Sequence, residues 1–289
     1  MNPQPLYDWI NERHAIYLRR AAGQPPPWTV DPILREYRFT NVFRELDAVT
    51  VWIRENIREP FADHPDLWFM MAIARQINWP ETLQELIDCG VWPEKSWSWE
   101  HFRDVMRDRS ARGEKVYTGA YMLRGPIQGD PSGSQDKPNY TALRVLEPVW
   151  ADRVKLRPWM KLRLQDACAA LEAYHGWGGF LAYEVATDLR HCPGWLDKAP
   201  DIMTWANPGP GALRGLNRLY GRPVKQALNR EQAITEMQLL LLMSLLYLGS
   251  HVPALEMRDI EHSLCECDKY LRVKLGEGRP RAKYDYRSE

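Results

Sequence analysis

The sequence predicts an all-α fold, and three observations lead to that prediction. Apolar residues recur at three- and four-residue spacing over most of the chain, which is typical of amphipathic helices. The alternating pattern of half-buried strands is nearly absent. Several prolines and glycines, such as Pro60 and Gly90, stand at the ends of the periodic segments, where they terminate helices.

The first half of the chain is expected to begin with a proline-rich segment over 20–32, which does not favour helix. From Thr40 to Pro60 apolar residues recur at helical spacing, so one helix is expected there. Further helices are expected over 67–77, 80–89 and 99–112. Residues 115–123 contain β-type side chains and could be extended, although an internal Gly-Ala pair weakens that reading.

The second half follows a glycine-, proline- and serine-containing segment over 124–139, which reads as an exposed loop or a boundary between lobes. We expect a single catalytic helical domain over 1–289, which could divide into an N-terminal lobe, 1–130, and a second lobe, 140–289. Helices are expected in the second lobe over 140–150, 158–174, 180–190, 212–220, 230–248 and 253–275.

The composition is that of an ordinary soluble globular protein, with 45% apolar and 26% charged residues. Because the net charge is zero, nucleic-acid binding would need a compact local patch. The five cysteines are irregularly spaced and form no Cys-x-x-Cys pair, which favours a reduced, intracellular protein. The N-terminus lacks the pattern of a signal peptide, and the most apolar run, 239–248, is too short to span a bilayer. We therefore expect a cytoplasmic protein with no membrane partner.

The segment 175–182 reads Gly-apolar-Gly-x-x-x-Ala between two apolar-periodic segments. This is the spacing of the hairpin in a helix-hairpin-helix unit, with which DNA glycosylases grip a DNA backbone. Gly176, Gly178 and Gly179 permit a tight reversal, and the N–H groups of the next helix could then face a phosphate. We expect a DNA-glycosylase-like helical architecture; an ordinary tight turn is the alternative.

Two carboxylates, Glu184 and Asp188, lie four residues apart on the helix after this hairpin and share one face. They could act as a general base and its partner, or simply form salt bridges on a helix surface. A second glycine turn, 207–211, leads into a helix whose N-terminus could bind an anion with the help of Arg214, or could be a plain turn. No phosphate-binding loop of the Gly-x-x-x-x-Gly-Lys-Ser/Thr type occurs, and no metal site is expected.

Four ordered segments carry a family resemblance: 38–47, 177–189, 209–216 and 260–270. Together they resemble the α-glutamyl/putrescinyl thymine pyrophosphorylase family and the helical domain of 5-hydroxymethyluracil DNA kinases, with which phages hypermodify thymine. The resemblance covers roughly residues 35–285. Glu184 departs from it, because glutamine is expected at this position in many relatives.

The resemblance implies a specific chemistry. A kinase first pyrophosphorylates 5-hydroxymethyluracil in DNA, and an enzyme of the present type then displaces pyrophosphate with an amine. The amine is an amino acid or a polyamine such as putrescine, and the new C–N bond forms at the thymine methyl carbon. Without a phosphate loop the chain should be the transferase and not the kinase. The partners would be DNA containing modified uracil and a small amine, in the cytoplasm of an infected bacterial host. No cofactor is certain; Mg²⁺ accompanying the pyrophosphate is left open.

The chemistry assigns candidate roles to residues of the four segments and their surroundings. A base in duplex DNA would be flipped out to be reached, and aromatic side chains would receive it. We also expect Asp188 and Arg214 to line one pocket, because both follow glycine turns. The candidates are Asp188, Glu184 and Glu261 as general base, Arg44, Arg214, Lys269 and Arg272 for pyrophosphate, Asn41 for the uracil edge, and Trp177, Tyr183 and Tyr121 for stacking.

Two alternatives remain open. A monofunctional helix-hairpin-helix DNA glycosylase is one; a lyase mechanism is not expected, because Phe180 stands where such enzymes carry lysine and only Asp201 could supply the acid. A non-catalytic DNA-binding helical module is the other, and it predicts that the carboxylates are paired in solvent.

Overall fold

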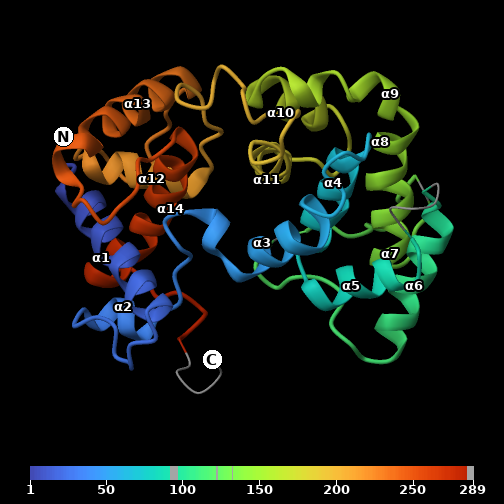
Figure 1. Cartoon of the computed structure of the whole chain (residues 1–289), viewed down its shortest axis with the longest axis horizontal. Helices are drawn as coiled ribbons and strands as arrows, with labels where there is room; N and C mark the ends of the chain where they lie inside the picture. Colours follow the sequence, from blue (N-terminus) through green and yellow to red (C-terminus); the bar gives the residue numbers. More distant parts are fainter. Residues whose placement is uncertain (92–96, 122, 132, 285–289) are drawn as a thin grey trace. The chain divides into compact units, whose positions relative to one another are not determined.

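The computed structural model describes residues 1–91, 97–121, 123–131 and 133–284. Within these ranges the protein is helical and contains no strand beyond an isolated antiparallel bridge between Tyr37 and Lys283, so the predicted all-α class is confirmed (Figure 1). The chain divides into two compact units: unit 1 is Met1–Asp47 with Ile202–Glu289, and unit 2 is Ala48–Asp201. The segment 124–139 lies inside unit 2. No helix in the described ranges is long and apolar enough to cross a membrane.

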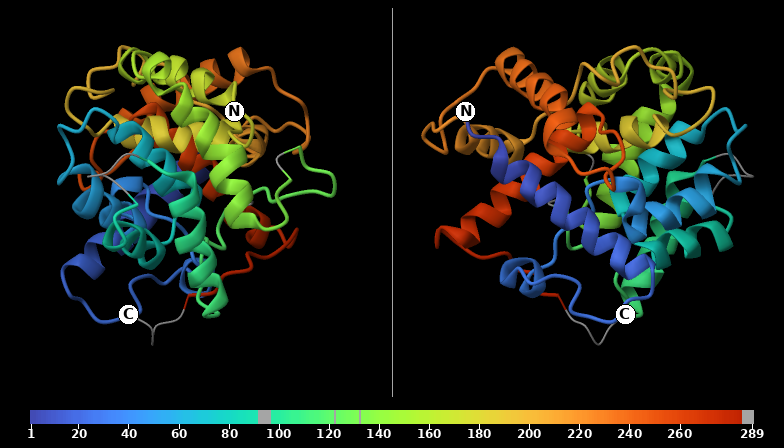
Figure 2. Two further views of the ribbon diagram at one scale, coloured as in Figure 1. Left: turned by 90° about the vertical axis from the view of Figure 1, so that its right-hand side faces the viewer. Right: turned by 60° about the vertical axis from the view of Figure 1, so that its left-hand side comes forward.

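Unit 1 is built around α14 (Met257–Lys274). The helix α12 packs closely on it. The approach is so close at Gly215 that a Cβ atom there would collide with the carbonyl group of Leu264, so only glycine fits at this position. The helices α1 and α13 also contact α14, and Figure 2 shows α1 and α14 from two further sides. The other elements of unit 1 are α1 (Gln4–Ala21), α2 (Pro32–Glu36), η1 (Arg44–Leu46), α12 (Pro210–Leu219) and α13 (Arg230–Tyr247).

Unit 2 has α4 (Leu67–Ile77) at its centre, and every side chain of this helix is buried. A helix that is apolar nearly all round is expected to be surrounded by protein. It packs against α11 (Gly179–Leu189), which in turn packs against α10 (Leu164–Glu172). The remaining elements are α3 (Ala48–Ile53), η2 (Arg54–Arg58), α5 (Pro80–Asp88), α6 (Trp99–Ala111), α7 (Lys137–Asn139), η3 (Tyr140–Leu146), α8 (Glu147–Ala151), α9 (Arg153–Leu156) and η4 (Trp159–Lys161).

The prediction of one helix from Thr40 to Pro60 is wrong at its start. The chain from 40 to 47 is irregular apart from η1, and α3 begins only at Ala48. Asp47 accepts the backbone N–H of Asn41, and the Asn41 amide donates to the carbonyl of Leu46 at 2.7 Å. These side-chain bonds compete with helical backbone bonds and hold a compact loop instead.

Three other segments differ from the sequence-based expectation. The helix α1 had not been expected, and the helix predicted over 158–174 is divided into η4 and α10 by an extended residue, Arg163. Residues 115–121 form no strand, while residue 122 of that prediction lies outside the described residues. The helices predicted over 67–77, 80–89, 99–112, 180–190, 212–220, 230–248 and 253–275 are confirmed to within a few residues at their ends.

Candidate functional site

The loop between α10 and α11 contains the tight turn that carries the glycine pattern. Gly176 has φ +83°, and a Cβ atom there would lie 2.6 Å from Cγ2 of Val145. Both the backbone conformation and the available space therefore require glycine. Gly178 is the N-cap of α11 and Gly179 its first residue, so neither brings a side chain to the helix start. Contact of these glycines with a DNA backbone stays a prediction.

Two of the three aromatic candidates are buried in unit 2. Trp177 is 2% exposed, and its indole N–H donates to the carbonyl of Val145 at 3.1 Å, which ties the hairpin to η3. Tyr183 is also 2% exposed. A base could stack on either ring only after the surrounding side chains moved. Tyr121, in contrast, is half-buried and makes an edge contact with the exposed ring of Phe180.

The carboxylate pair of α11 faces an arginine that sequence reasoning missed. Arg75, on α4, donates from Nε and Nη2 to the two carboxylate oxygens of Asp188, both at 2.6 Å. Its Nη1 lies 4.0 Å from Oε2 of Glu184. Thr50 and Asn78 accept further bonds from the same guanidinium. We call these five residues the Arg75 cluster.

The Arg75 cluster is buried, and its charges are close to balanced. The side chains of Arg75 and Asp188 are 3% and 2% exposed. Burial alone would lower the pKa of Arg75, but the adjacent Asp188 outweighs it and raises that pKa above its ordinary value. Arg58 adds a second positive charge, with Nη1 at 3.9 Å from Oδ1 of Asp188. Two arginines thus face two carboxylates, which is how proteins tolerate buried charge.

A polar chain leads outward from this cluster. The hydroxyl of Tyr121 donates to Oε2 of Glu184 at 3.2 Å, and Glu184 is 2% exposed. Asp188 is held by Arg75 through both oxygens, whereas Glu184 is linked to the half-buried Tyr121. Of the two carboxylates, Glu184 is therefore the one that is connected, through Tyr121, to a side chain that solvent can reach.

The predicted pyrophosphate ligands lie in unit 1. Asp268, which is 1% exposed, accepts from Arg214 and Arg218 at 2.8 Å each, and Arg272 lies 4.0 Å away. We call these four residues the Asp268 cluster. The side chains of Arg214 and Arg272 are 35% and 37% exposed. Arg218 also pairs with Glu277, so three guanidinium groups meet two carboxylates, and the remaining positive charge is on the exposed Arg214 and Arg272.

The remaining unit 1 candidates are engaged in local bonds. Lys269 pairs with Glu266 at 2.6 Å, and Arg44 with Asp47 at 2.9 Å. Asn41 holds its own loop, as described above. Glu261 accepts the N–H of Gly209 at 3.2 Å, so this carboxylate already occupies the start of α12, where the sequence had indicated an anion site.

The cysteines of α14 are not disposed to bind a metal. Burial is the main cause that raises the pKa of both Cys265 and Cys267 to about 12, so both thiols are protonated near neutral pH. Among the residues that the structure describes, no group of three or more His, Cys, Asp or Glu side chains is arranged to hold a metal ion.

The candidate site residues therefore fall into two groups, one in each unit. Unit 2 brings together Tyr121, Glu184 and Asp188, next to the glycine hairpin, whereas Asn41, Glu261 and the predicted pyrophosphate ligands belong to unit 1. The expected pocket shared by Asp188 and Arg214 joins residues of different units and stays a prediction. Arg75 could have been found, because a lone charge inside the apolar run 67–77 must have a partner.

The chain matches the model of one protein family, "5-hmdU DNA kinase, helical domain", over residues 3–279. The chain belongs to this family. It is similar to the 5-hmdU DNA kinase of Bacillus phage SP10, with 29% identity over 236 residues, which are 75% of this chain and 36% of the relative. The chain thus spans about a third of that relative's length. No solved structure matches it.

The family match confirms the resemblance to the helical domain of these kinases, and it extends further than the sequence motifs. It begins at residue 3 and so includes α1, which precedes all four motif segments. It covers the hairpin and the Arg75 cluster of unit 2 as well as the Asp268 cluster of unit 1.

Proposed function

We propose that this protein is a DNA base-modifying transferase, which displaces pyrophosphate from pyrophosphorylated 5-hydroxymethyluracil in DNA with an amine. Membership of the helical-domain family supports a place in 5-hydroxymethyluracil chemistry. The absence of a phosphate-binding loop from the 289 residues argues that this chain is not the phosphate-transferring part of such a system.

The observation that carries the proposal is the polar chain from Tyr121 through Glu184 to the Arg75 cluster. Buried charged groups cost stability, and an arrangement of this kind beside a turn is typical of functional sites. Glu184 is held from one side by the Tyr121 hydroxyl and from the other by Arg75. Its carboxylate is fixed in position, which is what a general base needs.

The nitrogen of a neutral amine attacks the exocyclic methylene carbon, a C–N bond forms, and the C–O bond to pyrophosphate breaks. The nitrogen gives one proton to Glu184, and pyrophosphate leaves with the bonding electron pair. Asp188 acts as a positioning residue, because it holds Arg75 in place. The exposed arginines of the Asp268 cluster are the candidates for binding pyrophosphate, with Mg²⁺ as a companion of that leaving group.

The experiment supplies duplex DNA containing pyrophosphorylated 5-hydroxymethyluracil together with glycine, glutamate and putrescine. The expected product is a nucleoside whose mass has gained one amine and lost pyrophosphate, as read by mass spectrometry after digestion. Glu184→Gln is expected to lose the product while it still binds the DNA. Release of free base would instead identify a glycosylase, and unchanged DNA would contradict the proposal.

A second candidate is a DNA-binding module that presents the substrate to a separate catalytic domain. The chain spans only about a third of the phage kinase, which favours such a role. This reading expects Glu184 and Asp188 to be paired in solvent, but both are 2% exposed. In the experiment above it predicts tight DNA binding and no product with any amine.

A further inference from the structure

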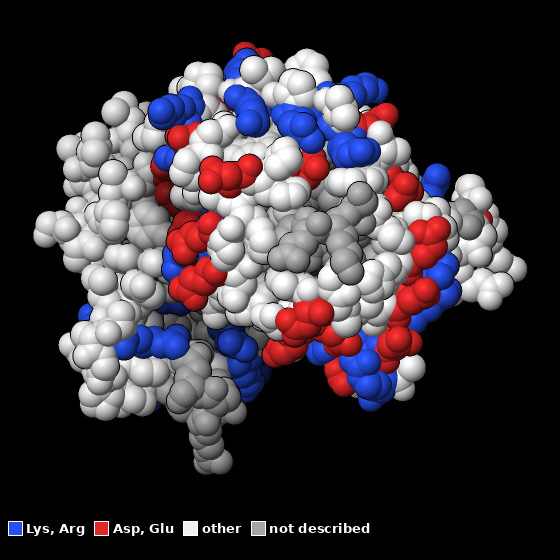
Figure 3. Space-filling model, turned by 45° about the vertical axis from the view of Figure 1, so that its right-hand side comes forward, with Lys and Arg blue, Asp and Glu red and all other residues white. Residues whose placement is uncertain are grey.

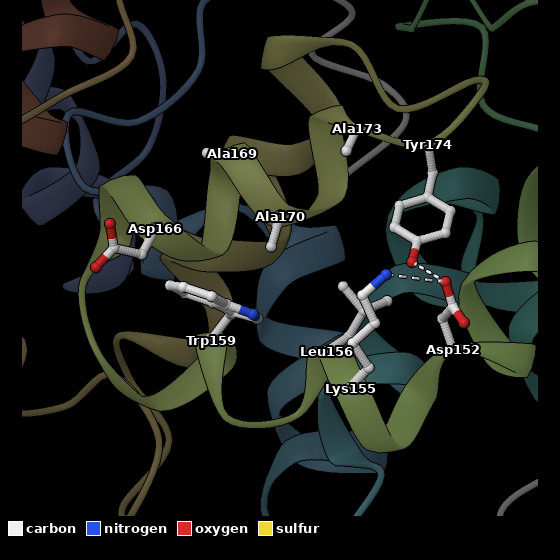
Figure 4. A pocket seen from close by; sticks show the side chains of 9 residues that line it. All are labelled: Asp152, Lys155, Leu156, Trp159, Asp166, Ala169, Ala170, Ala173 and Tyr174. Atoms are coloured by element: carbon white, nitrogen blue, oxygen red, sulfur yellow. Dashed lines mark hydrogen bonds and ion pairs between the residues drawn. The ribbon is translucent and has the colours of Figure 1, made fainter.

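A surface hollow of about 550 Å³ lies in unit 2, between α10 and the segment that carries α9 and η4. Figure 4 shows Trp159 beneath the alanines of α10, with Asp166 at one end and Tyr174 with Asp152 at the other. The volume is in the range of small-molecule pockets and exceeds that of a single nucleobase. The alanines leave room over a flat surface, so a planar ring fits better than a branched side chain.

The walls offer the contacts that a base needs. Trp159 is 45% exposed, so one face of its indole is available for stacking. Tyr174 donates its hydroxyl to Asp152 at 2.5 Å, and Lys155 lies 3.7 Å from the same carboxylate. Asp166 has no hydrogen-bond or ion-pair partner among the described residues, so its carboxylate can accept an N–H group from the edge of a base.

The segment that borders the hollow has an excess of positive charge. Residues 152–166 include five arginines and lysines and two aspartates, Asp152 and Asp166, both of which line the hollow, in a chain whose net charge is zero. Lys155 and Arg163 are 75% and 49% exposed, and Lys161 lies against the ring of Trp195. Figure 3 shows Lys and Arg side chains along the top of one face of the molecule, with Asp and Glu side chains among them. This charge complements a phosphate backbone.

The hollow and the glycine hairpin are connected by one helix. One wall of the hollow is the outer face of α10, the helix that leads into the hairpin, and Tyr174, which also lines the hollow, directly precedes the segment 175–182. The hollow is therefore close to the hairpin along the chain.

We propose that this hollow binds one unpaired base of a DNA strand, stacked on Trp159, while the neighbouring phosphates contact Lys155, Lys161 and Arg163. The site lies on the outer face of α10, whereas the Arg75 cluster lies on the inner side, where α11 packs against α4. The hollow thus holds the strand and does not perform the amine transfer. The inference rests on the proposed function only in taking DNA as the substrate.

The test uses unmodified single-stranded DNA, so it does not depend on amine transfer. An oligonucleotide containing 5-iododeoxyuridine is irradiated with the full chain, and the crosslinked peptide is mapped by mass spectrometry. The expected crosslink falls on Trp159 or Tyr174. Trp159→Ala should weaken binding about 5- to 150-fold, the effect of losing one stacked base. Trp99→Ala, which removes a tryptophan from α6 of the same unit, should leave binding unchanged.

A second variant keeps the proposal testable if Trp159→Ala fails to fold. Lys155→Ala with Arg163→Ala should reduce the slope of log affinity against log salt by about 1.4, since each phosphate contact contributes about 0.7 for single strands. Arg103→Ala with Lys115→Ala makes the same change of charge elsewhere in unit 2 and should leave the slope unchanged. Crosslinks confined to other peptides, a wild-type slope in the first pair, or tighter binding of an RNA of the same sequence would overturn the proposal. Correct crosslinks without amine transfer would overturn the proposed function alone.

Discussion

The Arg75 cluster of unit 2 and the Asp268 cluster of unit 1 use the same residue types in different ways. In the first, the arginine and the aspartate are both at most 3% exposed, and the charges cancel inside the protein. In the second, the side chains of Asp268 and Arg218 are buried, whereas those of Arg214 and Arg272 are more than a third exposed. The first arrangement fixes a geometry, whereas the second leaves positive charge where an anion from solution can reach it.

The largest effect is expected from breaking the buried pair. Arg75→Met leaves Asp188 buried without compensation and should lower the free energy of unfolding of unit 2 by about 3–5 kcal/mol. Urea denaturation followed by circular dichroism measures this. The double variant Arg75→Met with Asp188→Leu should recover part of the loss, because no charge remains unpaired. A loss below about 1 kcal/mol in the single variant would show that the pair is not the fixed element described here.

The next prediction compares the two carboxylates of the Arg75 cluster, Glu184 as the proposed general base and Asp188 as the positioning residue. Glu184→Gln preserves shape and should reduce the rate of amine transfer about 10²- to 10⁴-fold, with little change in stability, because it removes the proposed base. Asp188→Asn should lose transfer and also stability, since it leaves Arg75 without its charged partner. Single-turnover rates and melting curves of both variants are compared. Full activity of Glu184→Gln would remove this residue from the mechanism.

The exposed side chains of Arg214 and Arg272 should contribute to pyrophosphate binding and little to the stability of the fold. Arg214→Ala or Arg272→Ala should weaken inhibition by pyrophosphate roughly 10- to 150-fold, as expected for one lost charge-assisted hydrogen bond. Inhibition constants measured at two salt concentrations test this, with Arg103→Ala on α6 as the control. Unchanged inhibition in both variants would argue that the Asp268 cluster is only structural.

The smallest effect is expected from a buried histidine that has no carboxylate among the groups that shift its pKa. His14 of α1 is 3% exposed; burial, with His251 and Arg13 adding to it, lowers its pKa below the ordinary 6.5. As the pH falls through 6.5 the unfolded chain takes up a proton that the folded chain does not, so stability falls over this window. We expect the melting temperature to drop by roughly 2–4 °C between pH 7.5 and 5.5.

His14→Phe supplies the control for this pH dependence, because it keeps a ring against Phe43 and removes the titrating group. The variant should show a flatter profile between pH 7.5 and 5.5. An identical slope in both proteins would assign the effect to another group.

The sequence was a good guide to the apolar helix α4, every residue of which is buried, and to Gly176, where both the backbone and the space require glycine. It found the position of α13, but the apolar run 239–248 is not the buried core helix that its composition predicts, because Leu242, Leu245 and Leu246 are 66%, 78% and 83% exposed. It failed in α1, whose inward face includes the polar side chains of Arg13 and His14 and so hides the apolar period. It also failed at 40–47, where side-chain bonds from Asn41 and Asp47 replace helical bonds.

The candidate site shows the same limit. The spacing of Glu184 and Asp188 placed both on one face of a helix, but it could not name the group opposite them. Arg75 is 113 residues away from Asp188 in the sequence, and only the packing of α4 on α11 brings the two together. The local pattern therefore identified two of the five residues of the cluster, and the other three, Arg75, Thr50 and Asn78, came from the tertiary structure.

The order of the units along the chain determines which unit can fold first during translation. Unit 2 is one continuous segment, whereas unit 1 needs residues from both sides of it. When the ribosome has made Asp47, unit 1 still lacks α12, α13 and its central helix α14, and these follow only after residue 201. The ribosome adds 227 residues between Asp47 and Lys274, the end of α14, so at about 5–20 residues per second the helix α1 must wait roughly 11–45 s for all three. During that interval its apolar face lacks α13 and α14 and has Phe39 and Phe43 beside it from its own unit, so nascent chains stalled near residue 201 should bind chaperones through α1.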